Sequence, residues 1–212
     1  MCPVTDIAFV GLGRMGLPMC AVLVETGYEV HATDERAEAR AEAGACGASW
    51  RGTPGEAAAA AGVLITMLPG PSQVSTALTG PGGALPAMRP GATWIDMTSN
   101  SPGLARPIRE QAIERGVQVL EAPVGGGPQA ARQGRLQLFV GGDAAVLESS
   151  RPILAALADA IHGSPAGRLS AAARALCSNA AGSPRSAWSA GGSGRTRPGC
   201  ASLRSDGWVW VP

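Results

Sequence analysis

A short apolar segment, a glycine motif and an amphipathic segment follow one another at the start of this chain. The segment Asp6–Val10 is mostly apolar and has the residue types of a strand, and Leu17 to Thr26 has helical spacing. Between them the six residues from Gly11 to Gly16 read G-x-G-x-x-G. This motif, placed between a strand and a helix, is typical of a nucleotide-binding turn in an α/β fold.

Each glycine of the motif has its own steric reason. Gly11 permits a tight turn, Gly13 lets a pyrophosphate approach the backbone, and Gly16 lets the helix pack close to the strand. The amide groups at the helix start then face the phosphates, and the helix dipole favours their charge. We predict dinucleotide binding here. In a chain with 30 glycines, a purely structural turn is the alternative. The predicted contact residues are Gly11, Leu12, Gly13, Arg14, Met15 and Gly16.

Composition narrows the class of protein. The chain has 212 residues, of which 45% are hydrophobic and 4% aromatic, so one domain with an aliphatic core is expected. A net charge of +1 does not indicate a nucleic-acid or membrane partner. No window approaches the roughly 18 apolar residues of a membrane span. Without a signal-peptide pattern or paired cysteines, we expect a cytoplasmic protein with reduced thiols and no metal site.

Strand and helix patterns alternate from residue 6 to about 162. The expected strands are Asp6–Val10, Glu29–Thr33, Ala48–Trp50, Val63–Leu68, Ala92–Asp96, Val117–Glu121 and Leu136–Val140. The expected helices are Met15–Thr26, Arg36–Ala43, Pro54–Ala61, Pro71–Leu78, Pro102–Arg115 and Asp143–Leu157. This order predicts a Rossmann-type, doubly wound, mostly parallel sheet with helices on both faces. The strand after Gly134 is expected near the far edge.

The segment 164–212 has a different composition. It is rich in alanine, glycine, serine and arginine, and it carries six arginines against one acidic residue, Asp206. After Leu176 few apolar residues recur at regular spacing, so we expect an irregular or disordered tail from about residue 180. An apolar patch at Trp208–Val211 is the exception. A basic tail that binds nucleic acid is disfavoured, because stacking aromatics do not alternate with the arginines. The predicted domains are 1–163 and 164–212.

Asp34 closes the second expected strand, 23 residues after Gly11. A carboxylate there accepts hydrogen bonds from the adenosine ribose and repels a 2′-phosphate, which favours NAD over NADP. Arg36 could meet a 2′-phosphate if its side chain turned inward, so NADP stays open. The structural alternative for Asp34 is a turn residue that caps the next helix.

Three loops rich in glycine, proline or hydroxyl residues follow expected strands: Leu68–Pro71, Asp96–Pro102 and Glu121–Ala130. Ligands bind beyond the carboxyl ends of parallel strands, so we expect the loops to converge on one edge of the sheet. The consecutive Gly125, Gly126 and Gly127 expose amide groups suited to a carboxylate. Plain connections, with Ser101 as a helix cap, are the alternative.

These motifs together resemble the β-hydroxyacid dehydrogenase family, of the 3-hydroxyisobutyrate and 6-phosphogluconate dehydrogenase type. Gly11–Met19 resembles its opening, Met67–Pro69 its cofactor loop, and Asp96–Pro102 its D-x-[ST]-[ST]-x-x-P segment. Glu121–Ala131 is similar to its substrate loop. The resemblance implies that Leu68, Pro69 and Ser99 contact the cofactor, and that Ser99, Gly125, Gly126 and Gly127 contact the substrate.

The chain departs from the family pattern in several places. The resemblance implies a catalytic lysine near Ala173, on a long helix after a glycine-rich turn, but the chain contains no lysine and the nearest basic residue is Arg174. It also implies a second, all-helical domain, for which only about fifty residues remain. Arginine stays protonated, so it could polarise a carbonyl but not deliver a proton. The resemblance also implies an asparagine after the lysine, but Asn179 does not keep the family's spacing. Glu121 and Gly125 replace an aspartate and a serine of the substrate loop.

Two functions are compatible with these residues. The first is an NAD(P)-dependent dehydrogenase that transfers a hydride to or from a short 3-hydroxy acid, with its catalytic half missing and 164–212 a remnant or frameshifted tail. The second is a non-catalytic NAD(P)-binding module or sensor. Turnover is not expected without the lysine. Surface meant for a helical half would be apolar, which predicts self-association.

Overall fold

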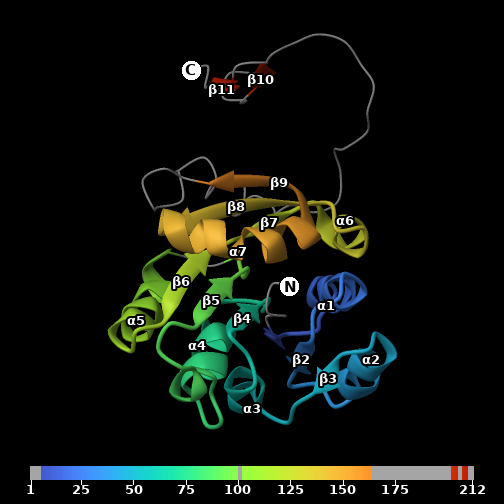
Figure 1. Cartoon of the computed structure of the whole chain (residues 1–212), viewed down its shortest axis with the longest axis vertical. Helices are drawn as coiled ribbons and strands as arrows, with labels where there is room; N and C mark the ends of the chain where they lie inside the picture. Colours follow the sequence, from blue (N-terminus) through green and yellow to red (C-terminus); the bar gives the residue numbers. More distant parts are fainter. Residues whose placement is uncertain (1–5, 100–101, 164–201, 205–206, 210–212) are drawn as a thin grey trace. The chain divides into compact units, whose positions relative to one another are not determined.

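The strand that precedes the glycine motif lies inside a parallel sheet in the computed structural model (Figure 1). The model describes residues 6–99, 102–163, 202–204 and 207–209. The first strands, in spatial order, are β3 (Ser49–Trp50), β2 (Val30–Thr33), β1 (Ile7–Val10), β4 (Val63–Thr66), β5 (Thr93–Asp96) and β6 (Gln118–Glu121). All of these pairs are parallel, which confirms the predicted Rossmann-type sheet.

The sheet changes direction beyond β6. β8 (Leu136–Gly142) runs antiparallel to β6, and it pairs with β7 (Val124–Gly125) and with β9 (Ala158–Gly163). The strand after Gly134 therefore lies near the far edge, as expected. The reversal itself, β7 and β9 were not predicted. Side-chain alternation is the same for either strand direction, so a strand pattern does not reveal its partner.

Seven α-helices and one 3₁₀ helix surround the sheet in the described part of the chain. They are α1 (Gly16–Glu25), α2 (Ala39–Ala45), α3 (Pro54–Ala59), α4 (Pro71–Thr79), η1 (Leu85–Ala87), α5 (Pro102–Glu114), α6 (Gly127–Arg132) and α7 (Ala144–Leu157). The sequence did not indicate α6, which overlaps the end of the expected substrate loop. α2 begins at Ala39 rather than Arg36, because the Asp34 carboxylate accepts a hydrogen bond from the Arg36 amide and holds a turn before it.

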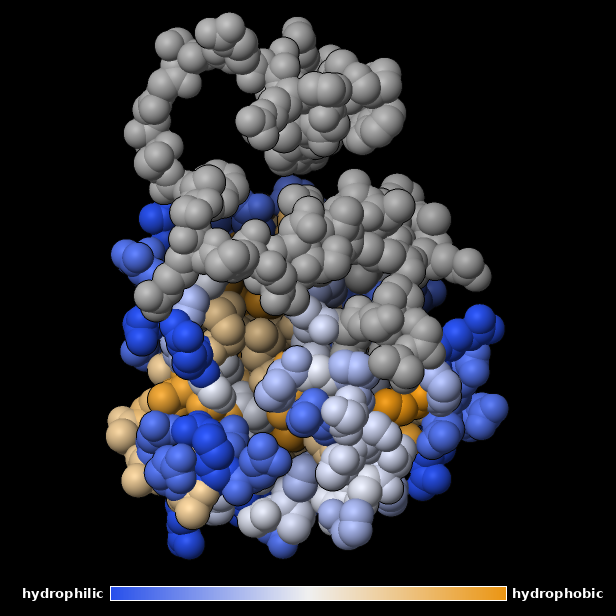
Figure 2. All heavy atoms as spheres, turned by 180° about the vertical axis from the view of Figure 1, so that it is seen from behind, coloured by the Kyte–Doolittle hydropathy of each residue, from blue (hydrophilic) through white to orange (hydrophobic). Residues whose placement is uncertain are grey.

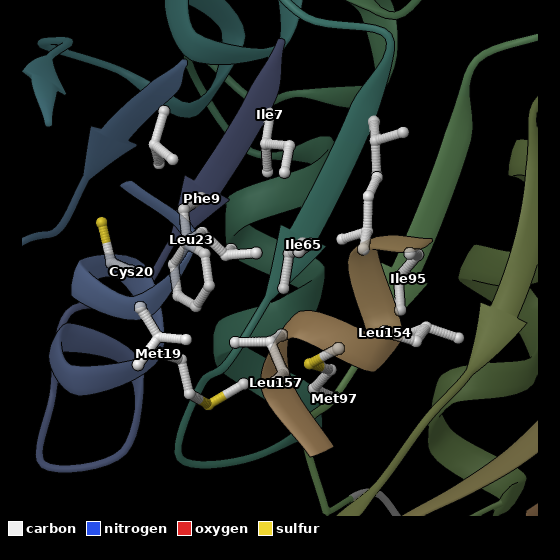
Figure 3. Packing of buried hydrophobic residues seen from close by; sticks show 14 of the residues in the cluster. Ile7, Phe9, Met19, Cys20, Leu23, Ile65, Ile95, Met97, Leu154 and Leu157 are labelled. Carbon is white, nitrogen blue, oxygen red and sulfur yellow. The ribbon is translucent and has the colours of Figure 1, made fainter. Parts of the chain in front are cut away.

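Alternate residues of the central strands supply two cores, one on each face. Ile7 and Phe9 of β1 belong to the core beneath α1, α2, α6 and α7, whereas Ala8 and Val10 belong to the core beneath α3, α4 and α5. In the first core, Met19 and Leu23 from α1 and Leu154 and Leu157 from α7 surround Ile7, Phe9, Ile65 and Ile95 (Figure 3). Trp94 is the largest fully buried side chain and fills the second core.

The chain divides into two units, Met1–Gly182 and Ser183–Pro212. In the second unit, β10 (Ser202–Arg204) and β11 (Gly207–Val209) form an antiparallel hairpin, which the composition did not predict. Most of the expected irregular tail, and the Trp210 and Val211 part of the expected apolar patch, lie outside the described residues.

The described surface of the first unit is mixed in character. Figure 2 shows hydrophilic residues over much of one face, with hydrophobic residues gathered between them. Ile113 on α5 is a large apolar side chain that is 61% exposed, and single exposed apolar residues of this kind are common on protein surfaces.

Candidate dinucleotide-binding site

Four strands end in register at one edge of the sheet. Val10 lies beside Thr66, Thr66 beside Asp96, and Asp96 beside Glu121. The glycine motif and the three loops that follow β4, β5 and β6 therefore begin side by side. This confirms the expected convergence of the loops, and it is the place where an open parallel sheet binds ligands.

The three glycines of the motif have different surroundings. A Cβ on Gly11, whose φ is +100°, would lie 2.4 Å from the Met67 carbonyl oxygen. A Cβ on Gly16 would lie 1.8 Å from the Gly11 carbonyl oxygen. A Cβ on Gly13 would meet no protein atom within 4 Å, and Gly13 is exposed. Gly11 and Gly16 thus serve the fold, whereas nothing in the protein surrounding Gly13 requires a glycine.

The start of α1 has the character of an anion site. The residue before the helix, Met15, makes no side-chain cap hydrogen bond, and the first turn carries no acidic residue. Amide groups at a helix start attract phosphate through their hydrogen atoms and the helix dipole. Together with the open backbone at Gly13, this arrangement fits a pyrophosphate. Arg14 is exposed beside it.

The Asp34 carboxylate connects the end of β2 to the glycine motif. Its Oδ2 accepts a hydrogen bond of 2.6 Å from the Leu12 amide, and its Oδ1 accepts bonds from the amide (2.9 Å) and Nε (3.1 Å) of Arg36. Asp34 does not cap α2, whose N-cap is Glu38. The side chain of Asp34 is 9% exposed, so the carboxylate is already largely engaged by the protein.

The loop after β4, in which Leu68 and Pro69 are predicted to contact the cofactor, is held by a threonine that was not among the predicted site residues. The Leu68 amide donates a hydrogen bond of 3.1 Å to Thr98 Oγ1, and Thr98 is 2% exposed. This bond joins the loop after β4 to the loop after β5. Ser99 and Pro69 are exposed next to it. Thr98 follows the strand within the quoted D-x-[ST]-[ST] segment, so the motif contained the signal.

A charged cluster lies beneath the second and third loops. Arg109 on α5 forms ion pairs with Glu121 and with Asp96 Oδ2, the latter at 3.7 Å. Burial raises the pKa of Asp96, while Arg109 and hydrogen bonds from Thr98 and Thr66 oppose that rise. The cluster ties α5 to the ends of β5 and β6. One arginine on a helix carries no sequence signal for this role.

The predicted substrate glycines form the turn into α6. Gly125 pairs with Gln137 as the last residue of β7, Gly126 has φ +117°, and Gly127 has φ +74°. A Cβ on Gly127 would meet no protein atom within 4 Å. α6 contacts α1, the helix that follows the glycine motif (Figure 1).

Several sequence predictions are not addressed by the described residues. Ser101, Ala173, Arg174 and Asn179 lie outside them. Within the described ranges, no group of three or more His, Cys, Asp or Glu side chains is arranged to hold a metal ion. In the same ranges, no helix combines the length and the hydrophobicity that crossing a bilayer requires.

Comparison with known proteins extends the geometric evidence. The family model for the NAD binding domain of 6-phosphogluconate dehydrogenase matches residues 6–166. The chain belongs to the β-hydroxyacid dehydrogenase family. Its matched residues are the NAD(P)-binding domain of such an oxidoreductase. The predicted strand–motif–helix order, and the Rossmann fold, are therefore confirmed.

Three similar proteins illustrate the family relationship. The chain is 41% identical to a probable 3-hydroxyisobutyrate dehydrogenase of Mycobacterium tuberculosis over 177 residues, which is 82% of this chain and 58% of that protein. It is 38% identical to an NAD-dependent L-serine dehydrogenase of Pseudomonas aeruginosa over 163 residues (76% of this chain, 55% of that protein). It is 36% identical to 2-(hydroxymethyl)glutarate dehydrogenase of Eubacterium barkeri over 156 residues (74% and 52%).

Solved structures have the same fold. The structure of Mycobacterium tuberculosis 3-hydroxyisobutyrate dehydrogenase with L-serine has a TM-score of 0.72 at 38% identity, and it matches 76% of this chain and 54% of its own length. A complex of Psf3 with NADP⁺ has a TM-score of 0.73 at 26% identity, over 82% and 61%. The chain thus spans little more than half the length of the relatives it matches.

Proposed function

We propose that this chain binds NAD(H) or NADP(H) at the loop edge of β1, β4 and β5, as the cofactor half of an oxidoreductase for short 3-hydroxy acids. The observation that carries the proposal is the contrast within the glycine motif. The protein's own packing requires glycine at Gly11 and Gly16, whereas the open space at Gly13 suits a ligand.

The residues that would hold the cofactor lie in the glycine motif, at the end of β2 and in the loop after β4. The turn from Gly11 to Gly16 would bind the pyrophosphate, Asp34 lies where an adenosine ribose is expected, and Leu68 with Pro69 would border the nicotinamide side. A bound nicotinamide supplies or accepts a hydride. The protein's part is to orient it against the substrate.

The substrate class is proposed from the third loop and from the relatives. The amide groups of Gly125 to Gly127 suit a carboxylate, and the exposed Ser99 hydroxyl can bind a substrate hydroxyl or a cofactor group. Relatives are named for 3-hydroxyisobutyrate and for L-serine, which are both short 3-hydroxy acids. These two compounds are therefore the first to test.

A second candidate function is a cofactor-binding module without turnover, and the absence of lysine from the printed sequence favours it. The family resemblance implies a lysine as proton donor. Arg174, near the expected position, cannot replace it, because a guanidinium keeps its proton at any working pH. We expect this chain to bind NADH and to show no oxidation of 3-hydroxyisobutyrate or L-serine when NADH formation is followed by absorbance. Measurable turnover would exclude the non-catalytic module.

Binding is tested by NADH fluorescence titration of the wild type, Gly13→Val and Gly44→Val. Both glycines have open space at the Cβ position, but Gly44 is on α2 and outside the motif. Gly13→Val is expected to weaken NADH binding at least tenfold, about 1.4 kcal/mol, and Gly44→Val to leave it unchanged. Circular dichroism melts check that both variants fold. Equal affinity of Gly13→Val and the wild type would refute the proposed site.

A further inference from the structure

The Arg36 guanidinium connects three parts of the candidate site. Its Nη2 donates a hydrogen bond of 2.8 Å to the Leu12 carbonyl oxygen in the glycine motif and one of 3.2 Å to Glu42 Oε2 on α2. Its Nε donates to Asp34 Oδ1 at 3.1 Å. A guanidinium presents its five N–H groups in a fixed plane, so these three contacts determine its orientation.

Carboxylates outnumber the cation at this position. Besides Asp34 and Glu42, Glu38 Oε1 lies 3.7 Å from Arg36 Nη1. Three carboxylates around one guanidinium leave a surplus of negative charge beside the expected adenosine ribose. These carboxylates would repel a 2′-phosphate at this position. Arg36 could bind the phosphate only by giving up its hydrogen bonds to Asp34, Glu42 and the Leu12 carbonyl.

The carboxylates of Glu38 and Glu42, at the start of α2 and within it, hold Arg36 independently of Asp34. The two Asp34 oxygens already accept bonds from the Leu12 amide and from Arg36, and the side chain is 9% exposed. Glu38 and Glu42, which are 68% and 39% exposed, hold Arg36 through Nη1 and Nη2, whereas the Asp34 carboxylate contacts its Nε and its backbone amide. Neither residue belongs to the glycine motif or to the strand end that the family pattern covers.

We propose that Glu42, assisted by Glu38, is a specificity-determining residue that holds Arg36 on the Leu12 carbonyl and thereby selects NAD(H) over NADP(H). The inference rests on the proposed cofactor binding. It implies that removing the two α2 charges frees Arg36 to bind a 2′-phosphate, while the contacts that NADH uses are kept.

The test is fluorescence titration of wild type, Glu42→Gln and Glu38→Gln/Glu42→Gln with NADH and NADPH. Glutamine preserves side-chain size and removes only the charge. The wild type is expected to bind NADH at least tenfold more tightly than NADPH. The double variant should bind NADPH at least fivefold more tightly than the wild type does, with its NADH affinity within twofold. Glu42→Gln alone should give most of this gain.

Two further variants make the result specific. Glu29→Gln removes the same charge at the opposite end of β2, where Glu29 is exposed, and should change neither affinity. Arg36→Gln added to the double variant should abolish its gain in NADPH affinity. If the gain survives, loss of negative charge alone explains it, and the role given to Arg36 is wrong.

The outcomes separate this inference from the function on which it rests. If the wild type binds both nucleotides equally, or if the double variant binds NADPH no better, the selection mechanism is overturned and cofactor binding stands. If the folded wild type binds neither nucleotide, both proposals fall. Melting curves for every variant verify that affinity changes are not caused by unfolding.

Discussion

The Leu12 amide donates a hydrogen bond of 2.6 Å to the Asp34 carboxylate, across 22 residues of sequence. This bond fixes the glycine motif to the end of the neighbouring strand β2. Leu12 is 1% exposed. Its amide would therefore lose this acceptor in a buried position if a shorter side chain replaced Asp34. The residue expected to bind a ribose therefore also shapes the turn that would bind the pyrophosphate.

Replacing Asp34 with alanine is expected to lower both stability and cofactor affinity. The change removes the acceptor of three hydrogen bonds, one from Leu12 and two from Arg36. We expect the free energy of unfolding to fall by about 2 kcal/mol in urea denaturation, because a buried donor loses its partner. NADH affinity should fall at least tenfold. Asp34→Asn keeps an acceptor oxygen and should lose less stability; equal losses would show that the Leu12 bond is unimportant.

Gly16→Ala is expected to destabilise the fold, in contrast to Gly13→Ala. The new Cβ at Gly16 would overlap the Gly11 carbonyl oxygen at 1.8 Å and lie 3.2 Å from the Phe9 ring. Moving α1 away from β1 should cost about 3 kcal/mol of unfolding free energy. Gly13→Ala has open space and should stay within about 0.5 kcal/mol of wild type. Similar urea midpoints for the two variants would contradict the assigned roles.

Arg109→Met is expected to make stability more dependent on pH. Burial raises the pKa of Asp96, so the folded protein binds that proton more tightly than the unfolded chain does. The resulting stability is present below the ordinary pKa and is lost as the pH rises through the raised one. Arg109 opposes the rise. Removing Arg109 should lower the free energy of unfolding by about 3 kcal/mol at pH 7.5 and by less at pH 5, where more of the Asp96 carboxyl is protonated.

Urea denaturation at both pH values measures this difference. Arg106→Met on the same helix is the matched control, because Arg106 is 76% exposed and pairs with Glu110 at the surface. The unfolding free energy of Arg106→Met should stay close to that of the wild type at either pH, because an exposed ion pair contributes little to stability. Adding Asp96→Asn to Arg109→Met should remove the extra pH dependence. If the dependence remains, another group carries it.

Local sequence patterns were enough to predict the order of β1 to β6 with the helices α1 to α5, and the edge at which the loops converge. Helix and strand periodicity are local properties, and so are the steric demands at Gly11 and Gly16, so the Rossmann order and the glycine turn could be predicted. The three loops could also be placed at one edge, because parallel strands end on the same side. The roles of Ser99 and of Gly125 to Gly127 in substrate binding remain predictions.

Which distant side chains meet depends on how the elements pack, and this could not be predicted from the sequence. The antiparallel direction of β8, the Leu12–Asp34 bond and the clusters around Arg36 and Arg109 all join segments that the sequence pattern treats separately. A charged side chain has several reachable partners, and the choice among them depends on how helices pack on the sheet. Strand partners are undetermined for the same reason, because the period of a strand is independent of its neighbour.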